Sequence, residues 1–294
     1  MNNLRVFSFF IISLLLFGDL FAQNGEGNGS NDAKKLYNEG MAALRTGKTD
    51  LAIQKLNGAV AKDPNLAIAY YALGIGYKMK RDYVSAQKSY QNAIDKDSRF
   101  VKAYTGLGLL QLQQQKYIES INTFKAALKI KPDEVKAQWG IGDAYRRQKD
   151  YNTAIKYYQE AVTTDMTYAR AWDGLGASLY ELGRYADAVD AFTTALQYQK
   201  KNKEKEGTYL RLANSYSKLK NNSEAEKAYK ECLAIVRSSN IRAAANFGLG
   251  EISKKRGKKQ EALAFFEKAS KNRNWQQPAL YEIDLIKNGD KYTN

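Results

Sequence analysis

The 294-residue chain has no histidine, one cysteine and three prolines. Without histidine it can form neither a catalytic dyad or triad that uses an imidazole base nor a metal site with imidazole ligands. A single cysteine permits no intramolecular disulfide and no zinc site built from several thiolates. Three prolines in a chain that is 44% hydrophobic favour an ordered, helix-rich protein over a proline-rich disordered one.

Basic residues exceed acidic ones: 46 lysines and arginines stand against 31 aspartates and glutamates, a formal net charge of +15. This excess favours anionic partners, such as acidic proteins, membrane surfaces or nucleic acids. The length suits about two ordinary domains or one elongated array.

The first 22 residues have the layout of a secretory signal peptide. Arg5 precedes an apolar run over residues 6–17, and Ala22 is the best residue to precede cleavage. The run is shorter than the roughly 20 residues that a membrane span needs, although an uncleaved anchor is the alternative. The absence of a nearby cysteine excludes a lipoprotein cleavage site. We expect a flexible linker, rich in Gly, Asn and Ser, over residues 23–32.

The body of the chain repeats every 34 residues. Small residues, Ala or Ser, follow each repeated glycine by 12 positions, Leu or an aromatic residue by 16, and Ala by 19. Two further copies have Ala213 and Gly250 at the glycine position, after steps of 37 residues. The three added residues, near 202–205 and 240–242, are either longer loops or one extra helical turn. The glycines of the regular copies are Gly40, Gly74, Gly108, Gly142 and Gly176.

This pattern resembles the tetratricopeptide repeat (TPR) family. The clearest copies are Tyr70-x-x-Leu73-Gly74-x-x-Tyr77 and Trp172-x-x-Leu175-Gly176. The resemblance implies an all-α fold, a right-handed α-solenoid of about seven helix-turn-helix repeats plus a C-terminal capping helix. In each repeat the small residues let helices A and B approach, and aromatic side chains fill the space between them. The predicted segments are a signal peptide at 1–22, a linker at 23–32, a TPR array at 33–276 (repeats 33–66, 67–100, 101–134, 135–168, 169–202, 206–239 and 243–276), and a capping helix and tail at 277–294.

In this family, positions 2, 5, 9 and 12 of helix A line a concave groove, where partners bind. Four of the first five residues at position 2 are cationic, although a cation near a helix N-terminus costs about 0.3–1 kcal/mol. We therefore expect a partner segment with acidic or carboxylate groups in the groove; solvated cations without a ligand are the alternative. The expected groove residues are Lys34, Tyr37, Tyr71, Lys102, Lys136, Trp139, Asp143, Arg146, Arg170 and Asp173.

The turns between helices A and B carry nearly all of the net charge of +15. Cations favour the end of a helix, but the ends of the B helices show a much smaller excess. We expect this basic edge to contact an anionic membrane surface, an acidic protein or an envelope polymer; charge that serves only solubility is the alternative. Its main residues are Lys80, Arg81, Arg147, Lys149, Lys254, Lys255, Arg256, Lys258 and Lys259.

These features predict a non-catalytic protein–protein interaction scaffold, exported to the periplasm or associated with the outer membrane of a Gram-negative-type bacterium. The alternative is an anionic glycan- or lipid-binding module that uses the basic edge. Nucleic acid is a poor candidate partner because the signal peptide removes the protein from it. No cofactor or metal is expected.

Aspartate and cysteine are the residue types here that could be chemically reactive. Asp143 and Asp173 could form an acid/base pair, but we expect them to form ion pairs with the neighbouring Arg146 and Arg170. Cys232 lies on a helical pattern and is expected to be a buried small apolar residue rather than an intermolecular disulfide partner.

Overall fold

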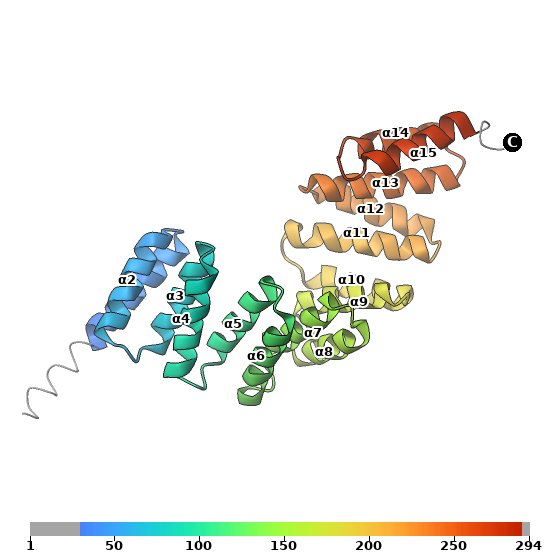
Figure 1. The fold of residues 1–294 in the computed structure, drawn as a ribbon. Helices are drawn as coiled ribbons and strands as arrows, with labels where there is room; N and C mark the ends of the chain where they lie inside the picture. The colour runs from blue at the N-terminus through green and yellow to red at the C-terminus, as the bar shows by residue number, and fades with distance from the viewer. Residues whose placement is uncertain (1–29, 290–294) are drawn as a thin grey trace, which may run out of the picture. The chain divides into compact units, whose positions relative to one another are not determined.

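The computed structural model describes residues 30–289, and these form helices joined by short turns. The predicted signal peptide, residues 23–29 of the predicted linker and the last five residues lie outside the described residues. A helix over residues 30–45 comes first. The helices that follow (Figure 1) are α2 Thr49–Lys62, α3 Ala67–Met79, α4 Tyr83–Lys96, α5 Val101–Gln113, α6 Tyr117–Ile130, α7 Val135–Arg147, α8 Tyr151–Thr164, α9 Ala169–Glu181, α10 Tyr185–Tyr198, α11 Asn202–Lys218, α12 Asn222–Ile235, α13 Ser239–Lys255, α14 Lys259–Ser270 and α15 Gln276–Asn288.

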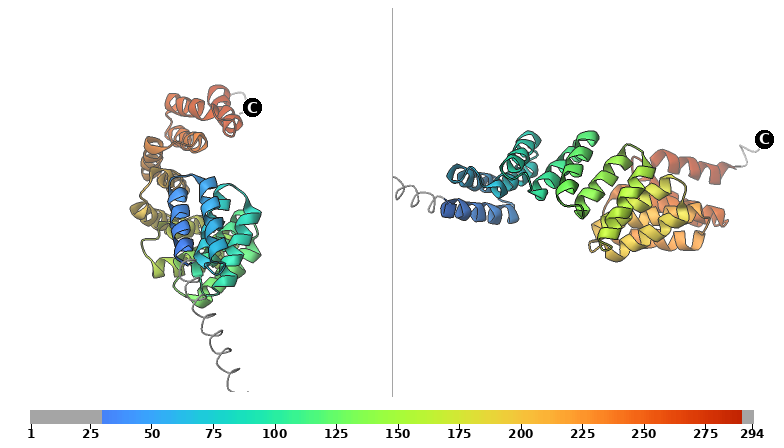
Figure 2. Two further views of the ribbon diagram at one scale, coloured as in Figure 1. Left: turned by 90° about the vertical axis from the view of Figure 1, so that its left-hand side faces the viewer. Right: turned by 90° about the horizontal axis from the view of Figure 1, so that it is seen from below.

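The chain divides into two compact units, residues 1–132 and 133–294, which we call the N-terminal and C-terminal units. Described residues of the N-terminal unit form the helices up to α6, and α7 to α15 form the C-terminal unit. Within each unit, successive helices form hairpins that pack against their neighbours in chain order (Figure 2). This arrangement is the all-α array of stacked repeats that the 34-residue period predicts, since no single hairpin can bury its apolar face alone.

The glycine column explains how closely the two helices of a hairpin pack. A Cβ atom on Gly142 would lie 2.9 Å from the Tyr158 ring, and one on Gly176 would lie 2.8 Å from the Phe192 ring. Both rings are fully buried. A side chain at Gly142 or Gly176 would therefore displace the aromatic ring of helix B that packs there.

The two long steps of the repeat lengthen a helix. Helices α11 and α13 have 17 residues, whereas α3, α5, α7 and α9 have 13. The added residues thus form an extra turn at the start of α11 and α13, which decides between the loop and the helix that the sequence left open. The first helix also begins early, because residues 30–32 of the predicted linker are helical. Ser30 and Asp32 suit a helix start, where they can accept hydrogen bonds from free backbone N–H groups.

The turns between helices A and B share one conformation with positive φ. Glycine occupies this position at Gly47, Gly183 and Gly257, with φ of 74°, 76° and 73°. Two residues of the predicted basic edge, Arg81 and Lys149, occupy it in other repeats with φ of 63° and 64°. A residue with a Cβ atom costs about 1–2 kcal/mol in this conformation, so these cations are not there for stability of the turn.

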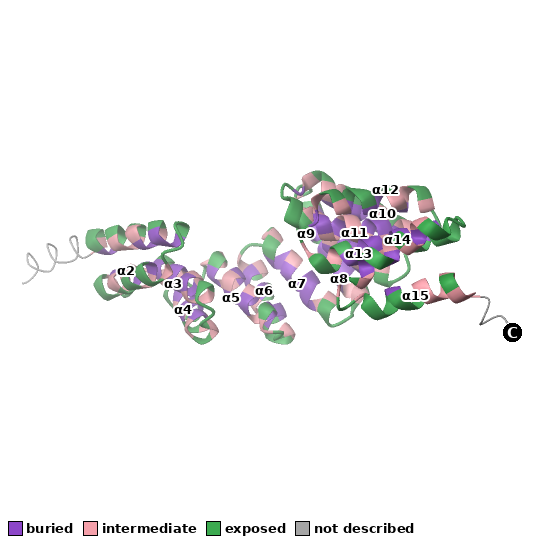
Figure 3. Ribbon diagram, turned by 90° about the horizontal axis from the view of Figure 1, so that it is seen from above, coloured by how far each residue is buried: buried purple, intermediate pink, exposed green. Residues whose placement is uncertain are grey.

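The core of the C-terminal unit runs from α8 to α13, and a smaller cluster joins α14 to α15. Figure 3 shows that α15 is exposed or half-buried over most of its length. Ala279 is buried, while Ile283 and Ile286 pack against the cluster around Phe266, so α15 covers the last hairpin. Cys232 is fully buried, as predicted. Among the described residues, no helix is both long and apolar enough to cross a membrane.

Candidate functional site

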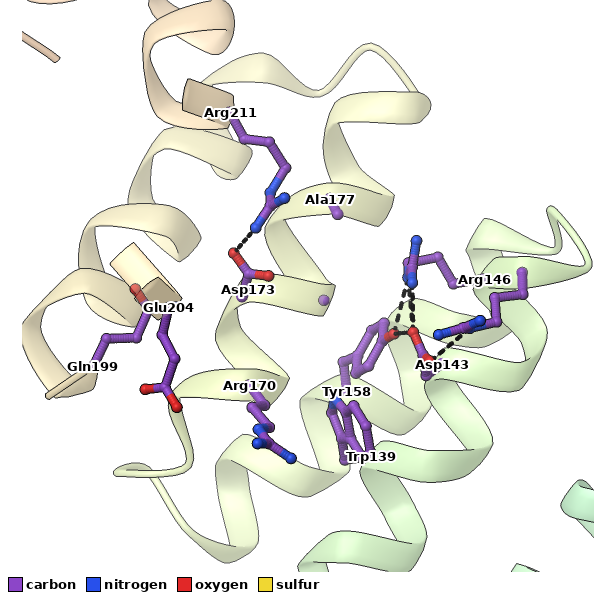
Figure 4. Close-up of a pocket in the computed structure, with 12 residues that line it drawn as sticks. Trp139, Asp143, Arg146, Tyr158, Arg170, Asp173, Ala177, Gln199, Glu204 and Arg211 are labelled. Carbon is purple, nitrogen blue, oxygen red and sulfur yellow. Dashed lines mark hydrogen bonds and ion pairs between the residues drawn. The ribbon is translucent and has the colours of Figure 1, made fainter. Parts of the chain in front are cut away.

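The C-terminal unit contains a pocket of about 320 Å³ formed by α7, α8, α9, the end of α10 and α11 (Figure 4). Helices α7 and α9 are the A helices of consecutive repeats, so residues 34 apart lie on equivalent turns: Trp139 matches Asp173, and Asp143 matches Ala177. The extra turn of α11 adds Glu204 at the rim. The full lining is Trp139, Asp143, Arg146, Arg147, Tyr158, Arg170, Asp173, Gly174, Ala177, Gln199, Glu204 and Arg211.

Asp143 joins two arginines to the wall of the pocket. It is 5% exposed, and its Oδ1 accepts from Arg146 Nη2 at 2.5 Å while its Oδ2 accepts from Arg147 Nε at 2.8 Å. The Tyr158 hydroxyl donates to the same carboxylate at 3.4 Å and accepts from Arg146 Nε at 3.3 Å. These bonds hold both guanidinium groups against the protein, so a ligand can bind either group only by competing with the Asp143 carboxylate.

Burial affects the pKa of two of these groups, Tyr158 and Arg146. It raises the pKa of Tyr158 above its usual range, and the nearby Asp143 charge adds to that effect, so the hydroxyl stays protonated and can donate. For Arg146, burial lowers the pKa, but Tyr158 and Asp143 outweigh it and hold the pKa above its ordinary value. Arg146 is therefore a permanent cation in a structural ion pair.

Asp173 ties α9 to α11. It accepts from Thr208 Oγ1 at 2.7 Å and from Arg211 Nη2 at 2.5 Å. Thr208 in turn accepts from Gln199 Nε2 at 2.9 Å. The sequence-based interpretation paired Asp173 with Arg170; the structure corrects this partner to Arg211, because the carboxylate points toward the next repeat. Both aspartates are thus in ion pairs, as expected, and neither serves as a free acid or base.

Arg170 and Glu204 are the exceptions in this pocket. The Arg170 guanidinium carbon lies 5.9 Å from the centre of the Trp139 ring, which is a cation–π distance. The Arg170 side chain is also hydrogen-bonded to Tyr168. Over the part of the chain that the structure describes, neither Arg170 nor Glu204 forms an ion pair. Figure 4 shows both side chains extending into the pocket, from α9 and α11. They are the charged groups that a ligand would meet first.

The structure brings together half of the ten predicted groove residues. Lys136 is exposed on α7 but does not line the pocket, and Tyr71 in the N-terminal unit packs against Tyr90 and Phe100. Tyr37 packs in the core cluster of the first repeats, while Lys34 and Lys102 are exposed. The residues in the pocket are Trp139, Asp143, Arg146, Arg170 and Asp173.

Sequence reasoning missed four polar lining residues. Tyr158 stands 16 residues after Gly142, in the column expected to fill the space between helices A and B; it is indeed buried, but its hydroxyl reaches the pocket. Gln199, Glu204 and Arg211 come from the junction of α10 and α11, where the 37-residue step shifts the repeat register. That step was the available signal: a helix lengthened at its start must place new side chains beside the preceding repeat.

Fewer cations of the predicted basic edge are free to bind an anion than the number of basic residues in the turns indicates. Lys80 pairs with Asp50 at 2.5 Å, Lys254 with Glu282 at 2.6 Å, and Arg256 with Glu226. These acidic partners come from other helices and so lie outside the turn positions that were counted. Arg147 is bound to Asp143, and Lys258 pairs with Glu261 at 3.2 Å. Lys255 and Lys259 are exposed. The described residues contain no group of three or more Cys, Asp or Glu side chains that could hold a metal ion.

Solved structures with a similar fold include several TPR proteins. The chain is 16% identical to a tetratricopeptide repeat protein from Parabacteroides merdae, with a TM-score of 0.60 over 88% of this chain and 100% of that one. It is 18% identical to PilF of Pseudomonas aeruginosa, with a TM-score of 0.63 over 70% of this chain and 93% of that one. For PilW, a type IV pilus biogenesis factor, the values are 17% identity, a TM-score of 0.61, and coverage of 69% and 92%. At these identities the likeness concerns the fold.

No curated protein matches this sequence significantly. Two sequence profiles of the tetratricopeptide repeat do match it, one over residues 37–77, 71–134 and 107–169, and the other over 167–238 and 204–274. Together they extend over most of the chain and over most of the helices of both units. The chain therefore belongs to the tetratricopeptide repeat family.

Proposed function

We propose that the protein is a non-catalytic scaffold of the bacterial cell envelope, and that its C-terminal unit holds a carboxylate-bearing segment of a partner protein in the pocket around Arg170. Family membership supports protein binding as the general activity. The envelope setting rests on the signal-peptide pattern at residues 1–22 and on the fold shared with PilF and the type IV pilus biogenesis factor PilW.

One observation carries the choice of site: Arg170 is the pocket's one arginine, among the described residues, without a carboxylate partner. Its stacking on Trp139 orients the guanidinium without neutralising its charge. A carboxylate can therefore bind Arg170 without first breaking an ion pair, whereas binding at Arg146, Arg147 or Arg211 would compete with an aspartate. Trp139 beside it offers apolar contact to the rest of the segment.

The alternative, an anionic glycan or lipid bound along the basic edge, has less support. Five of the nine predicted edge residues are already in ion pairs, namely Lys80, Arg147, Lys254, Arg256 and Lys258. An anion that approaches these cations has to displace their acidic partners, which reduces its gain.

Site-specific crosslinking in the native envelope tests the proposal. A photoreactive residue at Ala177, an uncharged position in the pocket, should capture one discrete partner. The same probe at Gln159, which is exposed on α8 outside this pocket, should not. Arg170→Gln should abolish the Ala177 product, and an equally strong product in Arg170→Gln would contradict the proposal.

A further inference from the structure

A second cavity in the C-terminal unit, of about 410 Å³, lies where the start of α13 meets the end of α14. Four of its eight lining residues are cationic and none is acidic. We call it the C-terminal cationic pocket. It is lined by Ser239, Arg242, Ala243, Asn246, Lys268, Lys271, Asn272 and Arg273.

The four cations have no carboxylate partner within the described residues. The Arg242 Nη2 donates to the Val236 carbonyl at 2.9 Å, and Lys268 Nζ lies 5.3 Å from the centre of the Phe265 ring. Neither contact neutralises charge. Lys271 and Arg273 are exposed. The contrast with the predicted basic edge is direct, since most cations there are paired with an acid.

Helix stability explains only part of this cluster. Lys268 and Lys271 stand at the C-terminal end of α14, where cations interact favourably with the helix dipole. Arg242 stands near the N-terminal end of α13, where a cation is unfavourable, and Arg273 lies in the following loop. Arg242 contributes to the end of α12 through its bond to the Val236 carbonyl, but neither arginine is placed favourably for the dipole of α13 or α14, and both raise the local positive potential.

Helices α11 and α13 differ in the charge that their first turns carry. Both α11 and α13 have an extra turn at the start, but α11 carries Glu204 in its first turn, whereas α13 has no acid there. Glu206, which is buried near the start of α11, accepts from the backbone N–H groups of Arg237 at 2.8 Å and of Ser238 at 3.4 Å, so its carboxylate lies at the start of α13. The first turn of α13 thus has no acid of its own, and the Glu206 carboxylate beside it is already bound to the backbone.

Hydrogen bonds connect the two segments that carry the cations of this pocket. Asn272 Nδ2 donates to Ser239 Oγ at 3.5 Å, and Asn274 Nδ2 donates to Asn240 Oδ1 at 3.3 Å, so the loop after α14 is joined to the start of α13. Asn246, which is buried, donates to the Arg242 carbonyl at 2.8 Å. Two exposed hydrogen bonds thus link the loop after α14 to the start of α13, and this link lowers the entropic cost of binding.

We propose that the C-terminal cationic pocket binds the phosphate group of a phosphorylated ligand. A phosphate dianion offers several acceptor oxygens, and the two arginines can engage it through paired N–H groups while the two lysines add charge. A single carboxylate would leave most of the positive charge uncompensated. The site shares no residue with the pocket around Arg170, so this proposal stands or falls independently of the proposed function.

The test is calorimetric titration of the full chain with inorganic phosphate and with glycerol 3-phosphate at low salt. Both should bind the wild type, and Lys271→Gln/Arg273→Gln should weaken binding by about tenfold, because charge-assisted bonds are lost. The matched control is Lys255→Gln/Lys259→Gln, which removes the same charge from exposed edge residues and should change affinity by no more than about twofold. Arg242→Gln is a further variant within the pocket, and it should weaken phosphate binding about as much as the Lys271→Gln/Arg273→Gln variant does.

Two results overturn the proposal: no saturable phosphate binding to the wild type, or equal losses in the pocket and edge variants, which would mean a response to net charge alone. Vesicles of phosphatidylglycerol in phosphatidylcholine identify the source of the phosphate. Vesicle binding that glycerol 3-phosphate competes away assigns a lipid headgroup. Phosphate binding without vesicle binding assigns a soluble phosphorylated ligand.

Discussion

The pocket around Arg170 and the C-terminal cationic pocket contain four cations each but use them in opposite ways. In the pocket around Arg170, three arginines are held by Asp143 or Asp173, and one is free of carboxylates. In the C-terminal cationic pocket, no lining carboxylate is available to any cation. The Arg211–Asp173 pair joins α11 to α9, and the two pairs of Asp143 lie within α7, whereas unpaired charges are available to a ligand. Counting charged residues along the sequence cannot separate these two roles.

The largest expected effect comes from removing the acid that joins two arginines. Asp143→Ala leaves Arg146 and Arg147 without a carboxylate partner, and we expect a loss of about 2 kcal/mol in unfolding free energy. The loss stays below that of a fully buried ion pair because these arginine side chains are 32% and 42% exposed. Urea denaturation followed by circular dichroism measures it. A change below about 0.5 kcal/mol would mean that the ion pairs contribute little to the fold.

A smaller loss is expected at the junction of α9 and α11. Arg211→Ala removes the charged partner of Asp173 but leaves the hydrogen bond from Thr208, so we expect a loss of about 1 kcal/mol. The same urea denaturation experiment checks this value. Thr208→Val in the same assay removes the second bond, and a double variant shows whether the two contacts are coupled. A loss as large as that of Asp143→Ala would break the proposed ranking.

Adding an acid beside the C-terminal cationic pocket, at the start of α13, should raise stability instead of lowering it. Asn240→Asp keeps the acceptor for Asn274 and places a negative charge in the first turn of α13, so we expect a gain of about 0.5 kcal/mol at low salt. The gain should shrink in high salt and should be accompanied by weaker phosphate binding. Asn222→Asp is the matched control, because α12 already has Glu224 in its first turn. An equal gain in both variants would remove the distinction between the two helix starts.

Removing a cation from the C-terminal cationic pocket should leave stability nearly unchanged. Lys271 is exposed and forms no ion pair among the described residues, so Lys271→Gln should shift the unfolding free energy by less than about 0.5 kcal/mol. Thermal and urea unfolding of this variant beside Asp143→Ala test the comparison with the least ambiguity. A clear loss of stability in Lys271→Gln would show that this cation also has a structural partner.

The sequence predicted the parts of the fold that depend on local spacing. The 34-residue glycine column requires close packing against a buried aromatic residue, as Gly142 and Tyr158 show. The family pattern also placed Trp139 and Arg170 on helices that face one pocket. These placements follow because the repeat fixes the register of each helix A relative to the next, while partner binding by the two residues stays a prediction.

What the sequence could not provide is the identity of partners that come from other elements. Arg211 reaches Asp173 from a helix whose register is shifted by the 37-residue step. Glu282 neutralises Lys254 from the capping helix, and Asp50 neutralises Lys80 from the first hairpin. Each of these pairs joins residues about one repeat or more apart in sequence, so their geometry becomes visible only in three dimensions.

The most direct test of the account compares Arg170 with Lys136 as ligand-binding cations. Both occupy the second position of a helix A, at the start of α9 and α7, but only Arg170 lines the pocket and stacks on Trp139. The measurement is the affinity of the partner captured at Ala177 for Arg170→Gln and for Lys136→Gln, with unfolding midpoints as a control. The account predicts that Arg170→Gln weakens binding by about tenfold or more at unchanged stability, while Lys136→Gln binds like the wild type. Equal losses in the two variants, or no loss in Arg170→Gln, would contradict it.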